Sequence, residues 1–222
     1  MLQYKKLIDI SQPVKADSAV FPGDTHFKRE IVLTYEKSQV VNLTALTMSP
    51  HVGTHVDAPS HIKGDLTSGQ DMVGSLPLEP FIGPVLVLNL APTNEGISWA
   101  SVKSRLDALK MNSEKLTERL LFKTKEKIRY DVFEDEYSFF TPELVQELSK
   151  RGVKLIGIDT PSADHVNSKT LEAHHELDKA KMTWLENLDL TNAEEGEYLL
   201  IAFPIKFMEL EASPVRAVLL KL

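Results

Sequence analysis

Four side chains that can bind a metal ion lie within eleven residues of this sequence: His51, His55, Asp57 and His61. Imidazole and carboxylate groups hold Zn²⁺ in catalytic sites, where three protein ligands leave one position open for water. The same groups also suit Mn²⁺ or Fe²⁺. The chain has no cysteine, so any metal must be held by His, Asp and Glu. The segment therefore predicts a metal site that activates water for hydrolysis.

The spacing of these residues disfavours both a straight strand and a helix. A strand would place His51 and His55 roughly 13 Å apart, at about 3.3 Å per residue, too far for both to bind one ion. A helix would bring the two histidines together but would turn Asp57 elsewhere, and Gly53 and Pro59 disfavour it. We therefore expect a bent loop that wraps His51, His55 and Asp57 around a cation, with Gly53 giving conformational freedom.

Ordinary surface or capping histidines are the alternative interpretation of this segment. A lone histidine is more often structural than a ligand. Here three of the seven histidines of the chain fall between positions 51 and 61, with an aspartate among them. The clustering favours the metal site.

A second group of polar residues follows an apolar run that ends near position 158. Asp159 comes directly after that run, where functional loops often begin. His174 and Glu186 are a further pair of candidate ligands. Adjacent residues in a helix point about 100° apart, so we do not expect His174 and His175 to bind the same ion.

Short apolar runs predict the strands that position these residues. Three alternating or β-branched runs predict half-buried strands, at residues 7–10, 30–35 and 41–48. Near-continuous apolar runs predict strands buried on both faces, at residues 84–90, 119–124, 153–158, 198–203 and 215–220.

Helices are fewer than strands. Thr141, Pro142 and Gly152 have the residue types of an N-cap, a first helical position and a helix end. Residues 98–109 and 169–182 also predict helices. Together the elements predict an α/β fold, a single layered domain of mixed β-sheet with a few helices over residues 1–222. The order of the strands is not predicted.

Composition excludes several classes of partner. The net charge of −7 argues against nucleic acid, because phosphate binding needs a basic patch. Two basic stretches, residues 123–129 and 150–154, are interleaved with acidic or apolar residues, and we interpret them as solvent-facing. No apolar run approaches the ~20 residues of a membrane helix. With no cysteine to form disulfides, the expected protein is soluble and cytoplasmic.

Taken together, the motifs resemble those of the cyclase family of metal-dependent hydrolases, and most closely its bacterial kynurenine formamidases. The histidine-rich segment carries most of the resemblance, which extends over nearly the whole chain. The other matching segments are residues 9–11, 21–25, 157–162, 168–170, 173–175, 185–186, 204–207 and 212–218. The resemblance implies the swivelling β/β/α fold of that family.

The resemblance also implies a ligand set. One metal would be bound by His51, His55 and Asp57. A second would be bound by Asp57, His174 and Glu186, with Glu186 able to touch both. The family uses Zn²⁺, so the two ligand sets imply two Zn²⁺ ions per subunit, with Mn²⁺ as an alternative metal. It is usually homodimeric, and its formamidases hydrolyse N-formyl-L-kynurenine to L-kynurenine and formate in tryptophan breakdown.

His61 matches the family's proton donor and acceptor, and an imidazole is suited to protonate a leaving aniline nitrogen. Phe21 stands where these formamidases usually carry a tryptophan that stacks on the substrate. Phenylalanine keeps an aromatic face but leaves a second substrate class open, a lactam or cyclic imide of the isatin type. A non-catalytic metal-binding protein of the same fold is the third alternative.

Overall fold

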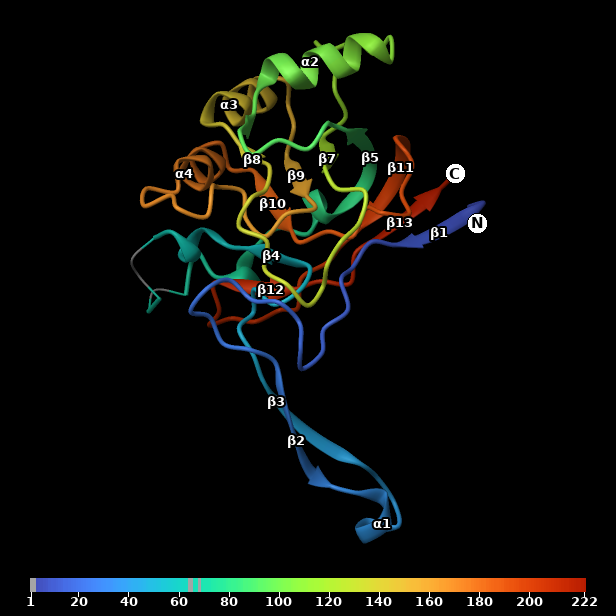
Figure 1. Cartoon of the computed structure of the whole chain (residues 1–222), viewed down its shortest axis with the longest axis vertical. Helices are drawn as coiled ribbons and strands as arrows, with labels where there is room; N and C mark the ends of the chain where they lie inside the picture. The colour runs from blue at the N-terminus through green and yellow to red at the C-terminus, as the bar shows by residue number, and fades with distance from the viewer. Residues whose placement is uncertain (1–2, 64–65, 68) are drawn as a thin grey trace.

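The computed structural model describes residues 3–63, 66–67 and 69–222 of the chain, and a curled mixed sheet runs through its centre (Figure 1). Within the described residues this sheet has nine strands, in the order β1-β13-β11-β5-β7-β9-β10-β4-β12. In that order they span Lys6–Asp9, Val218–Lys221, Gly196–Ile201, Ile82–Asn89, Arg119–Lys123, Leu155–Ile158, Thr183–Glu186, His55–Asp57 and Ala212–Pro214. The four strands β5, β7, β9 and β10 are parallel, and the neighbours on either side are antiparallel.

The predicted apolar runs at residues 84–90, 119–124 and 153–158 form the middle of this sheet and are buried on both faces, whereas the runs at residues 198–203 and 215–220 form β11 and β13 nearer one edge, where Leu199, Ile201 and Val218 are only part-buried. Leu86 and Leu88 of β5 pack against the helices, while Val85 and Val87 of the same strand belong to the apolar cluster on the other face. Alternate residues of a strand point to opposite faces, so a continuous apolar run is what a two-sided core requires. The α/β prediction and the mixed sheet are confirmed.

Three helices cover one face of the sheet (Figure 1). They are α2 (Trp99–Ala108), α3 (Pro142–Lys150) and α4 (Glu172–Lys179). Thr141 caps α3 by accepting a hydrogen bond from the Leu144 amide, and Gly152 beyond its end has a φ of +81°. All three predicted helices are therefore confirmed. None of the helices in the described part of the chain is long and apolar enough to cross a membrane.

An arm made of β2 (Lys28–Leu33), β3 (Leu43–Thr47) and the short helix α1 (Tyr35–Ser38) extends away from the rest of the molecule (Figure 1). The prediction that these strands are half-buried is wrong, because the side chains of both strands are exposed on both faces. Ile31 is 58% exposed and Leu46 is 66% exposed. An alternation of apolar residues indicates that one face of a strand is apolar. It does not indicate whether that face is buried by other parts of the same chain.

The smaller elements were not predicted. They are the parallel strands β6 (Gly96–Ile97) and β8 (Phe139–Phe140) and the 3-10 helices η1 (Pro59–His61), η2 (Val73–Ser75) and η3 (Glu79–Phe81). The strands β4, β10 and β12 of the main sheet were also missed. Their segments, His55–Asp57, Thr183–Glu186 and Ala212–Pro214, are short and mostly polar or small, so no alternation or continuous apolar run marks them.

Candidate metal centre

The middle of the histidine-rich segment is a strand and not the loop that we predicted. His55 and Asp57 lie two residues apart on β4, so both side chains point to the same face of the sheet. β4 pairs with β10 in an antiparallel register that places Glu186 opposite His55. Their side chains meet, with His55 Nε2 3.3 Å from Glu186 Oε2. The register thus joins two candidate ligands that are far apart in the sequence.

The other two histidines of the segment lie just outside this strand. His51 precedes β4 in a turn, and Gly53 in that turn has a φ of +73°. A Cβ atom on Gly53 would lie 2.8 Å from Val14 Cγ2, so the predicted need for glycine is confirmed. His61 is the last residue of η1. The two bends bring the imidazole rings of His51 and His61 to 4.5 Å between centroids, a proximity that a straight strand could not give.

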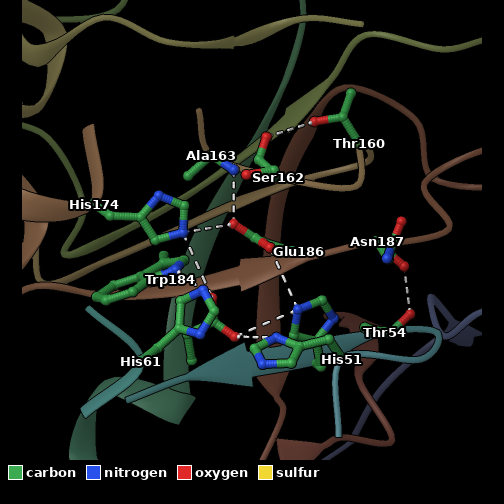
Figure 2. Close-up of polar contacts among 12 residues, drawn as sticks. His51, Thr54, His61, Thr160, Ser162, Ala163, His174, Trp184, Glu186 and Asn187 are labelled. Atoms are coloured by element: carbon green, nitrogen blue, oxygen red, sulfur yellow. Dashed lines mark hydrogen bonds and ion pairs between the residues drawn. The ribbon is translucent and has the colours of Figure 1, made fainter. Parts of the chain in front are cut away.

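His174 reaches the same place from helix α4 (Figure 2). Its Nε2 lies 3.6 Å from Asp57 Oδ2 and 3.4 Å from Glu186 Oε1. The neighbouring His175 is exposed. Of the two adjacent histidines, only His174 therefore faces the candidate ligands.

Asp164 fixes the ring of His174. One carboxylate oxygen, Oδ2, accepts hydrogen bonds from the His174 backbone amide at 3.0 Å and lies 2.6 Å from Nδ1 of its ring. The other oxygen accepts from the Ala173 amide at 3.0 Å. With Nδ1 held in this way, Nε2 is the nitrogen that points at the carboxylates.

The six candidate residues fit a divalent cation. Two compact groups of ligand atoms share Asp57: one adds His51 and His61, the other adds His55 and Glu186. Within the described part of the chain, His55 Nε2 and Asp57 Oδ1 are buried atoms whose close polar contacts, at 3.0 to 3.4 Å, are all with other candidate ligands and are poorly aligned for hydrogen bonding. A buried polar atom without a well-aligned hydrogen bond is costly, and a bound cation would satisfy both.

Electrostatics also suit a cation. Burial alone would raise the pKa of Asp57, yet the charges and hydrogen bonds of His51, His174 and His55 hold it well below its usual value. Burial opposes a lowered pKa of Glu186 in the same way, and hydrogen bonds from His174 and His55 prevail. Both buried carboxylates therefore stay ionised, as metal ligands must.

His51 and His61 differ in their surroundings. Burial would lower the pKa of His51, but Asp57 at 3.0 Å and Glu211 at 3.5 Å raise it to about 10. Burial lowers the pKa of His61, which the Asp57 charge only partly offsets. The His61 side chain is 30% exposed, and its Nε2 lies 4.0 Å from Asp57 Oδ2. His61 is thus the member of the cluster that reaches furthest toward solvent.

The cluster opens into a cavity of about 610 Å³. Phe21 lines this cavity, and its ring meets the edge of Phe133 at 5.3 Å between centroids. The interpretation of residues 123–129 as solvent-facing is wrong in part, because Lys125 is half-buried and lines the cavity. An alternation of charged and apolar residues does not reveal such a position.

Several residues at the site were not given a role from the sequence. Trp184 is buried, and its indole Nε1 donates to Asp57 Oδ2 at 3.3 Å. Asp164 orients His174, Glu211 contacts His51, and Phe133 completes the aromatic wall. None of these roles has a local signal in the sequence, because each depends on how separate segments of the chain pack together.

Comparison with known proteins agrees with this picture. The model of the family described as putative cyclase matches residues 8–165. A kynurenine formamidase of Bordetella pertussis is 40% identical over 218 residues, which cover 98% of this chain and 99% of that protein. The formamidase of Paracidovorax citrulli is 39% identical over 97% of this chain and 96% of its own. A solved structure of a predicted metal-dependent hydrolase from Bacillus stearothermophilus has a TM-score of 0.76 and 26% identity, with 98% of both chains covered.

Proposed function

This chain belongs to the putative cyclase family, and we propose that it hydrolyses N-formyl-L-kynurenine to L-kynurenine and formate in tryptophan breakdown. The observation that carries this proposal is the 40% identity to a kynurenine formamidase over 98% of the chain. The buried cluster of histidines and carboxylates at the floor of a substrate-sized cavity supports a hydrolytic reaction at that place.

We propose that two Zn²⁺ ions bind in the cluster, with Mn²⁺ as the alternative. His51, His55 and Asp57 would hold one ion, and Asp57, His174 and Glu186 the other. When bound, such a cation supplies an acidified water and a positive charge that stabilises the oxyanion of an amide undergoing hydrolysis. The protein supplies the orientation, since Asp164 fixes His174 and the Ala163 amide donates to Glu186 Oε1 at 2.6 Å.

His61 is the proposed general acid and base. It lies next to the cluster yet reaches toward the cavity, and burial lowers its pKa so that the neutral ring is favoured at neutral pH. A neutral imidazole can accept a proton from the attacking water and then deliver it to the leaving aniline nitrogen. Phe21, with Phe133 behind it, would stack on the aromatic ring of the substrate.

We further propose that residues 1–222 form one domain and that two chains form a homodimer. The pairing of β1 with β13 supports one domain, because it joins the two ends of the chain in a single sheet. The exposed apolar side chains of the β2–β3 arm support a dimer, since several large apolar side chains left uncovered on one pair of strands favour a partner surface.

An assay of purified protein on N-formyl-L-kynurenine, with isatin measured beside it, tests the substrate. We expect release of L-kynurenine and formate with a kcat/KM at least about 100-fold above that for isatin, within the range by which enzymes discriminate through placed polar groups. Faster hydrolysis of isatin would replace the proposed substrate with the lactam class that Phe21 left open. Bound metal with no hydrolysis of either compound would favour the non-catalytic alternative.

A further inference from the structure

The loop that follows β7 forms one wall of the cavity and is held rigidly at its start. The buried carboxylate of Asp159 accepts hydrogen bonds from the backbone amides of Thr124 and Lys125, each at 2.8 Å, and from the Thr124 hydroxyl at 2.6 Å. Further along, the Tyr130 hydroxyl donates to Asp189 at 2.6 Å. Side chains on this loop are therefore positioned before any ligand arrives.

Two opposite charges of this loop meet inside the cavity. Lys125 Nζ lies 2.6 Å from Glu134 Oε2, and both side chains line the cavity wall. They are 18% and 33% exposed, so the pair is partly shielded from water. A lysine ammonium has three donors and a carboxylate has two acceptor oxygens, so each member can bind a second partner of opposite charge.

The aromatic wall adjoins this pair. Phe133 precedes Glu134 directly, and its ring contacts Phe21. Across the same cavity are the candidate ligands and His61. The cavity thus combines a hydrolytic centre, an aromatic surface and a fixed pair of opposite charges.

We propose that the Lys125–Glu134 pair is a subsite for the zwitterionic α-amino-acid end of an aryl-amide substrate. The substrate carboxylate binds the Lys125 ammonium, and the substrate ammonium binds the Glu134 carboxylate. With substrate bound, the two charges of the pair and the two charges of the substrate alternate in sign. Each new contact is then a charge-assisted hydrogen bond in a place partly shielded from water. This inference rests on the proposed function and deepens it, because it explains how a formylated amino acid is chosen over a plain formanilide.

Arg129 and Lys169 also line the cavity, but both are exposed. The Lys125–Glu134 ion pair holds both of its side chains in place and offers one positive and one negative group. It is therefore the better match for a ligand that carries both an ammonium and a carboxylate. Arg129 and Lys169 offer only positive charge, which would serve a carboxylate alone.

Steady-state kinetics on two substrates test the subsite. Lys125→Met and Glu134→Gln are compared with wild type on N-formyl-L-kynurenine and on formanilide, which lacks the amino-acid group. The control is Lys154→Met, which breaks a 2.5 Å ion pair with Glu118 away from the cavity. We expect KM for N-formyl-L-kynurenine to rise about 10-fold or more with kcat little changed, as for lost ground-state binding. Turnover of formanilide should be unaffected, and an equal loss on both substrates would overturn the subsite.

Binding of L-kynurenine and of 2-aminoacetophenone, measured by calorimetry, separates this inference from the proposed function. Wild type should bind L-kynurenine at least about 10-fold more tightly than either variant does, and the three proteins should bind 2-aminoacetophenone alike. This holds even if wild type hydrolyses neither substrate, a result that would refute only the proposed function. Failure of wild type to bind L-kynurenine, or equal binding by all three proteins, would overturn the subsite.

Discussion

Single residues of the site divide into those that the sequence identifies and those that it does not. The types and close spacing of His51, His55 and Asp57 were enough to predict a metal centre. The structure brings these three close to His174 and Glu186, but the compact groups of ligand atoms place His51 with His61 and His55 with Glu186 rather than His51 with His55. The role of Asp164 could not be predicted, because it depends on how helix α4 turns its first residues toward a loop.

His61 provides a prediction at this scale. His61→Ala should keep its metal and lose about 10²–10⁴-fold in kcat, the usual contribution of a general acid or base. Metal content and turnover are measured on the same preparation, with His26→Ala, an exposed position, as the control. Turnover at the wild-type rate would refute the assignment. Loss of metal together with activity would show that His61 is a ligand, as its grouping with His51 and Asp57 allows.

Asp164 provides a second prediction. Asp164→Asn replaces one of the two accepting oxygens by an NH₂ group, which can only donate, so either the Ala173 amide or the donors of His174 lose their acceptor and the ring should lose its fixed orientation. We expect Zn²⁺ affinity to fall about 10–100-fold, as for other residues that orient a metal-binding histidine. Competition with a chromophoric chelator measures it. Glu195→Gln, which removes a largely buried carboxylate away from the cavity, is the matched control; an equal fall in both variants would contradict the role of Asp164.

At the scale of elements, segments with a clear apolar pattern or capping residues were predictable, and short segments without such a pattern were not. The apolar run of β5 and the capping residues of α3 each define their element locally. β4 and β10 are three and four residues long, and they exist because they pair with each other and with the sheet. Their register, which sets Glu186 opposite His55, is a property of the assembled sheet and leaves no local signal.

Glu195, which lies directly before β11, joins β5 to α2, and its hydrogen bonds predict how stability depends on pH. Its carboxylate accepts from the Asn89 amide at the end of β5 and from Arg105 Nε of α2, at 2.9 and 2.8 Å. Burial alone would raise the pKa of Glu195, but these hydrogen bonds hold it below its usual 4.5. Because the folded-state pKa is lowered, this stabilisation is present above pH 4.5 and is lost as the pH falls through the lowered value.

We therefore expect Glu195→Gln to lose about 1–2 kcal/mol of unfolding free energy at neutral pH. The difference from wild type should shrink as the pH is lowered below 4.5 and through the lowered pKa of Glu195. Urea unfolding of both proteins at several pH values measures it. A difference that is constant with pH would mean that the charge of Glu195 does not contribute.

At the scale of the whole molecule, the β2–β3 arm is the feature that a single chain does not explain. Ile31 and Leu46 lie on the same face of the arm, since Ile31 pairs with Thr44 and Leu46 with Arg29. Both are among the most exposed apolar side chains of the described residues. Apolar residues were placed correctly in strands from the sequence, but their partner surface could not be predicted from one chain.

The arm predicts an oligomeric state. The double variant Ile31→Lys and Leu46→Lys should be folded but have the mass of one chain in light scattering, where wild type has the mass of two. Burying a lysine charge in an apolar interface costs several kcal/mol, which is enough to dissociate a dimer at micromolar concentration. Glu126→Lys, on an exposed loop of the body, is the charge control. A wild type with the mass of one chain would contradict the dimer.

The central claim is that the buried cluster holds a metal on which hydrolysis of N-formyl-L-kynurenine depends. The most direct test is to remove metal from the purified protein with a chelator, add Zn²⁺ back in steps, and measure bound metal and kynurenine release together. We predict that activity disappears on chelation and returns in proportion to bound Zn²⁺, with saturation near two ions per chain. Full activity in metal-free protein, or metal uptake with no activity at any occupancy, would contradict the claim.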